Sequence, residues 1–160
     1  MEKVILHCAL NNFYASVEQK NHPEYNGMPL AVCGNPENRH GIVLAKNYLA
    51  KEAGVQTGEA IWISRKKCPN IIFVPPHFEE YVHYSNLVRS IYTEFTDRVE
   101  SFGLDECWLD VTGSLKFFGM TGPQLADHIR EEVKRRTGLT ISVGVSFTKV
   151  LAKLGYKNKK

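Results

Sequence analysis

A helical pattern over residues 78–95 constrains most strongly how this chain can fold. Apolar side chains recur there at intervals of three and four residues, at Tyr81, Tyr84, Leu87, Val88, Ile91, Tyr92 and Phe95. That spacing places them on one face of an amphipathic helix. Because an apolar face of this length must be buried against another layer of the fold, we expect the helix to pack on a sheet.

Short apolar segments typical of strands lie on both sides of this helix. Strands are predicted at 4–10, 29–33, 42–45, 71–74, 99–104, 107–111 and 140–145, and further helices at 13–20, 47–53, 60–67, 123–136 and 148–154. Between 29–33 and 42–45 the turn-forming loop GNPENRHG predicts a hairpin with a long tip. Helices that alternate with such strands predict an α+β fold with the helices on one face of the sheet.

The composition is that of a folded domain without disulfide bonds. The chain has 160 residues, 43% of them hydrophobic, and a net charge of +3, which suits one domain or two small lobes. Its cysteines form no CxxC pair and its histidines no HExxH motif, which argues against a zinc site or a disulfide framework. No signal peptide or membrane span is recognisable, so we expect a cytoplasmic protein without a membrane partner.

Two adjacent carboxylates, Asp105 and Glu106, lie between the strand-like segments 99–104 and 107–111. Neighbouring residues of a regular strand point to opposite faces, so both side chains can reach one ion only at a turn or a bulge. Gly103 favours such a break. Paired carboxylate oxygens suit Mg²⁺ bound together with substrate phosphates, whereas the alternative is a solvated acidic turn.

Two further segments have features of phosphate sites. Asn11 and Asn12 separate the first strand from a helix that opens with Phe13 and Tyr14. Amide groups at a helix start attract phosphate, and an aromatic ring there can stack on a sugar or exclude it. The alternative is that both rings belong to the core. The basic segment 144–160 would suit a polyanion or form a solvated tail.

Four segments, taken in order, resemble the N-terminal half of Y-family translesion DNA polymerases of the DinB (DNA polymerase IV) type. They are LNNFYASVE, GIVLAKNYLAKEAGVQTGEAI, SFGLDECWLDVT and ISVGVSFTKVLAKL, and the similarity covers essentially the whole chain. The resemblance implies a ferredoxin-like palm formed by 1–28 and 76–160, with a small fingers subdomain inserted at 29–75. The thumb and little-finger domains of the family would be absent.

The resemblance also implies roles for individual residues. Asp105 and Glu106 match the carboxylates that bind Mg²⁺, two ions per site in the family, and Leu10 matches a residue whose backbone carbonyl binds metal. Implied nucleotide contacts are the Phe13 backbone at the triphosphate, Tyr14 as the steric gate against ribonucleotides, Tyr48 and Lys160 at the triphosphate, and Lys51 where many members have arginine.

One position departs from the family at the centre of this site. Ala9 stands where the family has its first catalytic carboxylate, and a methyl group cannot bind a metal ion. The two-metal site would therefore lack its shared ligand. Near the C-terminal end, Tyr156 and Lys157 replace a Ser-Asp pair of the family.

These features lead us to expect the palm and fingers portion of a DNA-directed DNA polymerase that acts in translesion synthesis and DNA repair. The family reaction transfers a nucleotide from a dNTP to the 3′ end of a DNA primer-template, and Ala9 and the missing domains would impair it in this chain. The alternative is a non-catalytic nucleotide- or DNA-binding module. A metal-dependent hydrolase is less well supported, because no nucleophile or base lies beside Asp105 and Glu106 in the sequence.

Overall fold

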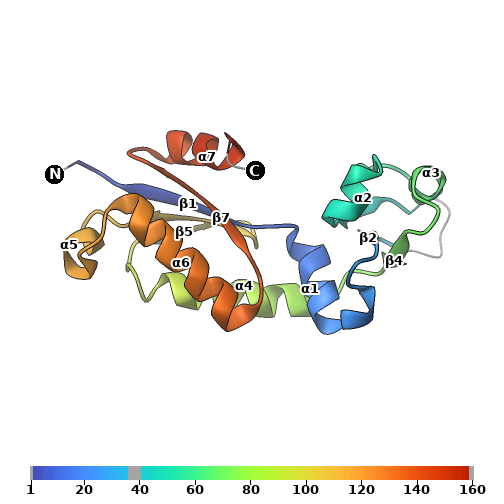
Figure 1. The fold of residues 1–160 in the computed structure, drawn as a ribbon, viewed down its shortest axis with the longest axis horizontal. Helices are drawn as coiled ribbons and strands as arrows, with labels where there is room; N and C mark the ends of the chain where they lie inside the picture. The colour runs from blue at the N-terminus through green and yellow to red at the C-terminus, as the bar shows by residue number, and fades with distance from the viewer. Residues whose placement is uncertain (1, 36–40, 159–160) are drawn as a thin grey trace. The chain divides into compact units, whose positions relative to one another are not determined.

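The computed structural model describes residues 2–35 and 41–158, with side chains up to residue 155 in the last helix. The chain forms two compact units (Figure 1). Unit 1 comprises Met1–Asn11 and Val82–Lys160, and unit 2 comprises Asn12–Tyr81, so unit 2 is inserted in the sequence of unit 1. Each unit has its own sheet.

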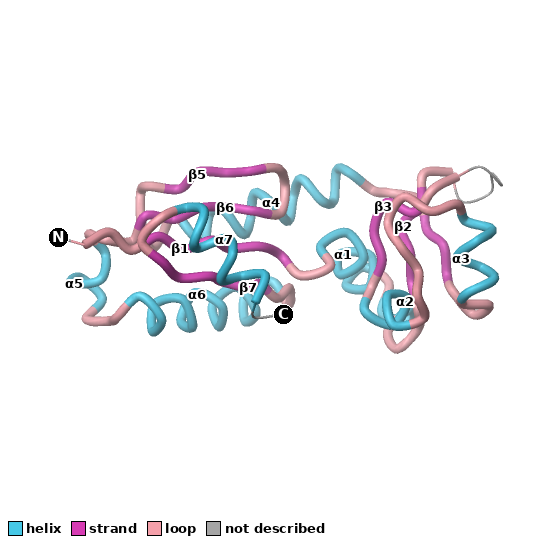
Figure 2. The backbone as a smooth tube through the Cα atoms, turned by 90° about the horizontal axis from the view of Figure 1, so that it is seen from above, coloured by secondary structure: helices cyan, strands magenta, loops and turns pink. Residues whose placement is uncertain are grey.

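Unit 1 contains a four-stranded antiparallel sheet (Figure 2). Its strands, in spatial order, are β5 (Val99–Phe102), β6 (Glu106–Asp110), β1 (Ile5–Leu10) and β7 (Ile141–Ser146). Its helices are α4 (Phe78–Tyr92, from residue 82), α5 (Ser114–Phe118), α6 (Gly122–Thr137) and α7 (Lys149–Asn158). With the first and third strands adjacent at the centre, this is the ferredoxin-like arrangement, and the predicted α+β fold class is confirmed.

The side chains of the central strand β1 point alternately to the two faces of this sheet. Leu6, Cys8 and Leu10 alternate with His7 and Ala9, and all are buried. The Cys8 thiol lies near Tyr92 and Arg130, so its face is covered by α4 and α6. Burial raises the pKa of this thiol well above its usual range.

Helix α7 lies over the other face of the sheet (Figure 1). Its Lys153 reaches Glu106, which is paired with Ala9 on that face. The prediction that all helices pack on one face is therefore wrong. Close approach is possible because two glycines meet: a Cβ atom on Gly155 would lie 3.7 Å from the Cα atom of Gly144.

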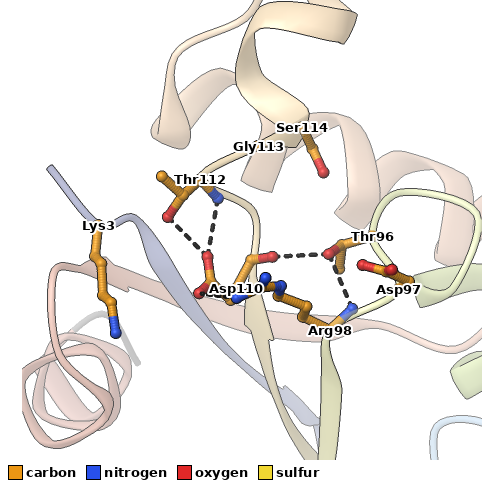
Figure 3. Close-up of a pocket in the computed structure, with 8 residues that line it drawn as sticks. All are labelled: Lys3, Thr96, Asp97, Arg98, Asp110, Thr112, Gly113 and Ser114. Carbon is orange, nitrogen blue, oxygen red and sulfur yellow. Dashed lines mark hydrogen bonds and ion pairs between the residues drawn. The ribbon is translucent and has the colours of Figure 1, made fainter. Parts of the chain in front are cut away.

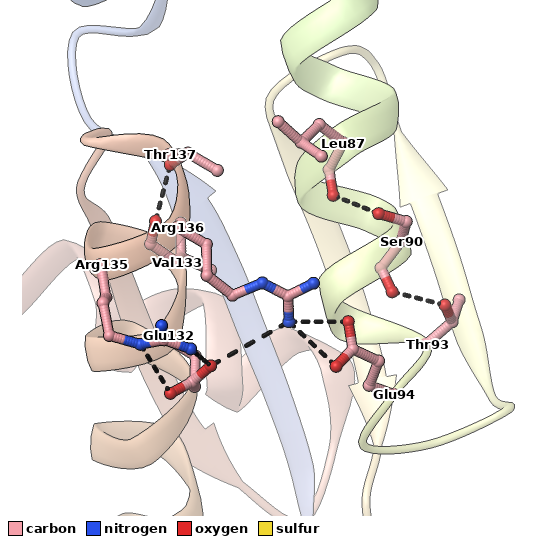
Figure 4. Close-up of polar contacts among 9 residues, drawn as sticks. All are labelled: Leu87, Ser90, Thr93, Glu94, Glu132, Val133, Arg135, Arg136 and Thr137. Atoms are coloured by element: carbon pink, nitrogen blue, oxygen red, sulfur yellow. Dashed lines mark hydrogen bonds and ion pairs between the residues drawn. The ribbon is translucent and has the colours of Figure 1, made fainter.

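Polar contacts join α6 to the end of α4 (Figure 4). Arg136 on α6 lies 2.7 Å from a carboxylate oxygen of Glu94 and 4.0 Å from one of Glu132. Exposed pairs of this kind contribute about 0–1 kcal/mol each. Both ends of helix α6 are capped. Thr121 and Gln124 form a capping box at its start, and Gly138, with a φ of 75°, ends it, as expected for a stable helix.

Unit 2 contains a three-stranded sheet with helices on both sides. Its strands, in spatial order, are β3 (Val43–Lys46), β2 (Leu30–Cys33) and β4 (Ile72–Val74). The antiparallel β2–β3 pair confirms the predicted hairpin, and β4 runs parallel to β2. The helices are α1 (Phe13–Asn21), the 3₁₀ turn η1 (Pro23–Tyr25), α2 (Tyr48–Glu52) and α3 (Ile61–Lys67).

Alternation along β2 gives unit 2 two small cores. Leu30 and Val32 pack with Ala15 of α1. Ala31 and Cys33 pack with a second set of buried residues, Val43, Ala50, Val55, Ile61 and Cys68, which includes members of α2 and α3. Along the described part of the chain, none of the helices is long and apolar enough to span a bilayer.

Asn47 ties three backbone groups of unit 2 together. Its side-chain oxygen accepts hydrogen bonds from the N–H groups of Leu30 and Ala50, each at 3.0 Å, and its amide nitrogen donates to the Met28 carbonyl at 2.7 Å. Asn47 is 5% exposed. It therefore caps α2 and also secures the start of β2.

We expect Asn47→Ala to lower the free energy of unfolding by about 2 kcal/mol, since it leaves buried backbone groups without partners. Urea unfolding followed by circular dichroism measures the change. Asn47→Asp, which keeps the accepting oxygen, should lose less, and the exposed Asn26→Ala serves as the control. An equal effect of Asn47→Ala and Asn26→Ala would contradict this role.

Candidate active site

The β5–β6 hairpin presents the two acidic residues at its turn. Gly103 has a φ of 69°, a left-handed conformation that costs glycine least. The carbonyl of Leu104 accepts a 2.5 Å hydrogen bond from the hydroxyl of Ser85 on α4. Asp105 is the last residue of this turn and Glu106 is the first residue of β6, so the regular alternation of a strand begins only after Asp105.

Pairing with β1 brings the first strand to the same point. Ala9 is directly opposite Glu106 in the antiparallel register, and the Leu10 N–H donates to the Asp105 carbonyl at 2.9 Å. Paired residues share a face with Cβ atoms about 5 Å apart. The methyl group of Ala9 is 2% exposed. Four residues singled out in the sequence, Ala9, Leu10, Asp105 and Glu106, therefore meet within unit 1.

Glu106 already has two cationic or polar neighbours. One of its carboxylate oxygens lies 2.9 Å from Nε2 of His7 and 3.6 Å from Nζ of Lys153. Lys153 also lies over the Phe102 ring, 5.0 Å from its centroid. The His7 side chain is fully buried, and this burial lowers the pKa of the ring despite the nearby Glu106. The imidazole is therefore neutral at neutral pH.

Asp105 has a different electrostatic environment. Desolvation by the surrounding protein atoms and, second, repulsion from the Glu106 carboxylate raise the pKa of the Asp105 carboxyl. Two carboxylates held this close favour binding of a cation, since a cation relieves their repulsion. The two carboxylates at the hairpin turn therefore provide the negative charge that a cation site needs.

The donor set fits one divalent ion better than two. Asp105 and Glu106 offer carboxylate oxygens and Leu10 a backbone carbonyl, which suits a Mg²⁺ or Mn²⁺ ion that keeps several waters. Within residues 2–35 and 41–158, no group of three or more His, Cys, Asp or Glu side chains is arranged to hold a metal. The third carboxylate that a two-metal site needs is missing, because the position opposite Glu106 is Ala9.

Four of the five residues with implied nucleotide contacts, Phe13, Tyr14, Tyr48 and Lys51, lie in unit 2. Phe13 is buried, whereas Tyr14 is only partly buried at the start of α1. Tyr48 begins α2 with 62% of its surface exposed, and Lys51 is exposed on the same helix. Lys160 lies outside the described residues.

Sequence reasoning missed two residues of this site, His7 and Lys153. His7 could have been found from strand alternation, since it precedes Ala9 by two positions and thus shares its face. Lys153 was seen only as part of a basic segment. Its contact with Glu106 depends on which face of the sheet α7 covers, and no local pattern indicates that.

A separate cavity lies at the far end of the same strands (Figure 3). Its volume is about 510 Å³, and it is lined by Lys3, Thr96, Asp97, Arg98, Asp110, Thr112, Gly113 and Ser114. Burial alone would raise the pKa of Asp110, but hydrogen bonds from the hydroxyl and N–H of Thr112 outweigh it and lower that pKa. The carboxylate is thus satisfied within the protein.

Comparison with known proteins decides the family. The model of the impB/mucB/samB family matches residues 8–157. The chain belongs to this family. Within it, the chain is 57% identical over 160 residues to a DNA polymerase IV of Acetivibrio thermocellus and 40% identical over 158 residues to a DNA polymerase IV 2 of Halalkalibacterium halodurans. The resemblance inferred from the sequence is therefore confirmed.

Solved structures give the same result for the fold. DinB from Sulfolobus solfataricus matches 98% of the chain with a TM-score of 0.90 and 31% identity, and an insertion ternary complex of Dbh DNA polymerase matches equally well. The chain spans 46% of each of these structures and about 40% of the two curated impB/mucB/samB relatives. The match supports the ferredoxin-like palm.

Proposed function

We propose that this chain forms the palm and fingers of a Y-family translesion DNA polymerase, with 1–28 and 76–160 as palm and 29–75 as fingers. Its partners would be a DNA primer-template and a dNTP. The observation that carries the proposal is the pairing of β1 with β6, which brings Ala9 and Leu10 beside Asp105 and Glu106. These are the positions at which the family resemblance implies the catalytic site.

In this proposal, unit 1 supplies the metal ligands. Asp105, Glu106 and the Leu10 carbonyl would hold Mg²⁺, which lowers the pKa of a bound hydroxyl and neutralises phosphate charge. The primer 3′ oxygen attacks the α-phosphorus of the dNTP in line, and pyrophosphate leaves. Tyr48, Lys51, Lys160 and the Phe13 backbone would bind the triphosphate, while Tyr14 would exclude a ribose 2′ hydroxyl.

Ala9 makes the chain a weak catalyst under this proposal. A missing metal ligand worth about 3–4 kcal/mol to the transition state lowers the rate by about 10²- to 10³-fold. Lys153 lies 3.6 Å from Glu106 and balances part of the charge that a metal would otherwise neutralise, while the neutral His7 ring lies within hydrogen-bonding distance of the same carboxylate. That observation favours the second candidate, a module that binds nucleotide or DNA without catalysis.

Metal titration separates a damaged polymerase from a module that never used metal. We expect the parent chain to bind Mn²⁺ weakly and Ala9→Asp to bind it more tightly, most clearly with dNTP present to add phosphate oxygens. Calorimetric titration of Mn²⁺ and dNTP into both forms measures this. Asp105→Ala in the Ala9→Asp background is the control. If Ala9→Asp gives no gain in affinity, or if Asp105→Ala gives no loss, the strand end and the hairpin do not share a metal.

DNA binding should be weak and sensitive to salt. In the described structure, exposed basic side chains such as those of Lys51, Lys66 and Lys116 are available to contact phosphates, so we expect sequence-independent binding that weakens steeply as salt rises. Fluorescence anisotropy with a labelled primer-template tests this. A dissociation constant near ~10⁻⁸ M at physiological salt, the range of specific binders, would contradict the expectation.

A further inference from the structure

Four aromatic side chains of unit 2 form a cluster between the starts of two helices. Phe13 and Tyr14 come from α1, and Phe78 and Tyr81 come from the first turn of α4. We call them the aromatic cluster. Phe78 meets both tyrosines edge-on, with ring centroids 5.9 Å from Tyr14 and 5.6 Å from Tyr81. Phe13 lies 5.7 Å from Tyr14 and 6.2 Å from Tyr81.

Within the aromatic cluster, Tyr14 rests flat on Tyr81. Their ring centroids are 4.2 Å apart and their planes differ by 10°. Tyr81 is fully buried, whereas Tyr14 is only partly buried. The buried ring is therefore the support, and the partly exposed Tyr14 ring follows its position.

The hydroxyl end of Tyr81 is held by a buried carboxylate. Glu18 is 2% exposed, and one of its oxygens accepts a 2.6 Å hydrogen bond from the Tyr81 hydroxyl and lies 2.7 Å from Nδ1 of His77. Burial and, second, the bond to Glu18 raise the pKa of Tyr81 well above its usual range. The hydroxyl thus keeps the proton that it donates.

Two side chains of helix α1 contact Tyr81, one at its ring and the other at its hydroxyl. Tyr14 and Glu18 are four residues apart, which places them one turn apart on the same face of the helix. Tyr14 covers the ring of Tyr81, and Glu18 holds its hydroxyl. An apolar side chain of similar volume would fill the space of Glu18 without the cost of burying a charge. Unlike an apolar side chain, Glu18 accepts a directional hydrogen bond, which fixes the position of the Tyr81 hydroxyl.

We propose that Glu18 is a positioning residue that fixes Tyr81 through its hydroxyl and thereby sets the orientation of the Tyr14 ring toward a nucleotide sugar. The sugar-directed half of this inference rests on the proposed function, in which Tyr14 excludes the 2′ hydroxyl. The ring-directed half stands on the contacts within unit 2 alone. The two halves call for separate measurements.

The first measurement follows the rings in the whole chain without nucleotide. Nuclear Overhauser effects between the ring protons of Tyr14 and residue 81 report their stacking. We expect these signals to weaken in Glu18→Ala and in Tyr81→Phe, which keeps the ring and loses only the hydroxyl. Glu18→Gln retains an accepting oxygen and should preserve them. Ser64→Ala, which removes another buried hydrogen bond of unit 2, to Glu59, is the matched control and should leave them unchanged.

The second measurement compares sugars in the same set of variants. The ratio of the dissociation constants for GTP and dGTP is measured by calorimetry with Mn²⁺. Because an aromatic pair is worth about 0.5–1.5 kcal/mol, we expect Glu18→Ala to lower this ratio about two- to tenfold. Glu18→Gln should restore the ratio, and Tyr14→Ala should abolish the discrimination.

Each outcome decides one half of the inference. Unchanged ring contacts in both Glu18→Ala and Tyr81→Phe overturn the positioning role. If Glu18→Ala does not fold, Tyr81→Phe decides this half alone. Altered ring contacts with an unchanged sugar ratio overturn the sugar-directed half while the ring-directed half stands. If Tyr14→Ala also leaves the ratio unchanged, the role of Tyr14 in the proposed function fails instead, and with it the sugar-directed half.

Discussion

Replacing Ala9 with aspartate should raise the rate of template-directed nucleotide transfer by about 10²- to 10³-fold, because it restores a metal ligand worth about 3–4 kcal/mol to the transition state. The new carboxylate would lie directly opposite Glu106 in the β1–β6 register. Extension of a labelled primer by one nucleotide, with Mg²⁺ or Mn²⁺, measures the rate in both forms.

Two matched variants show whether the new charge is responsible. Ala9→Asn has the shape of Ala9→Asp without the negative charge, and it should leave the rate near that of the parent. Asp105→Ala in the Ala9→Asp background should remove the gain. If Ala9→Asn accelerates the reaction as much as Ala9→Asp, the effect is not metal binding and the proposed site is wrong.

The same substitution should make folding stability depend on metal. Ala9 is 2% exposed, so aspartate there adds a third carboxylate to those of Asp105 and Glu106, in a buried position opposite Glu106. An uncompensated buried charge costs about 3–5 kcal/mol, and Lys153 offsets part of this cost. We expect Ala9→Asp in chelator to lose about 3 kcal/mol of unfolding free energy, and a divalent ion at 100 times its dissociation constant to restore about 2.7 kcal/mol.

Urea unfolding in EDTA and in Mn²⁺ measures this change. The parent chain should respond little to Mn²⁺, and Ala9→Asn should lose less stability in EDTA without recovering in metal. A loss in Ala9→Asp that Mn²⁺ leaves untouched would mean that the residue opposite Glu106 does not contribute to a cation site.

Much of the fold could be predicted from local patterns. The apolar spacing over 78–95 predicted α4, and the loop between 29–33 and 42–45 predicted the β2–β3 hairpin. These elements depend on neighbours in sequence, which periodicity reports well. The short helix α5 was not predicted, because its five residues span little more than one helical turn and its apolar residues do not repeat at helical spacing.

The candidate site could be predicted only in part. Gly103, Asp105 and Glu106 indicated a turn with two carboxylates, but nothing local to them shows that Ala9 lies opposite. Strand order and register determine that pairing, and only the family resemblance pointed to it. Similarly, Glu18 and Tyr81 lie far apart in the sequence, and their hydrogen bond depends on how α1 and α4 approach each other.

The central place of β1 has a consequence for synthesis of the protein in the cell. β1 ends at Leu10, but its neighbours β6 and β7 begin at Glu106 and Ile141. At about 5–20 residues per second, a ribosome needs roughly 7–26 s to reach the second neighbour after β1 is made. For the first roughly 5–19 s of that time, until β6 begins, this apolar strand has neither of its hydrogen-bonding partners, which makes it a target for chaperones that bind exposed strands.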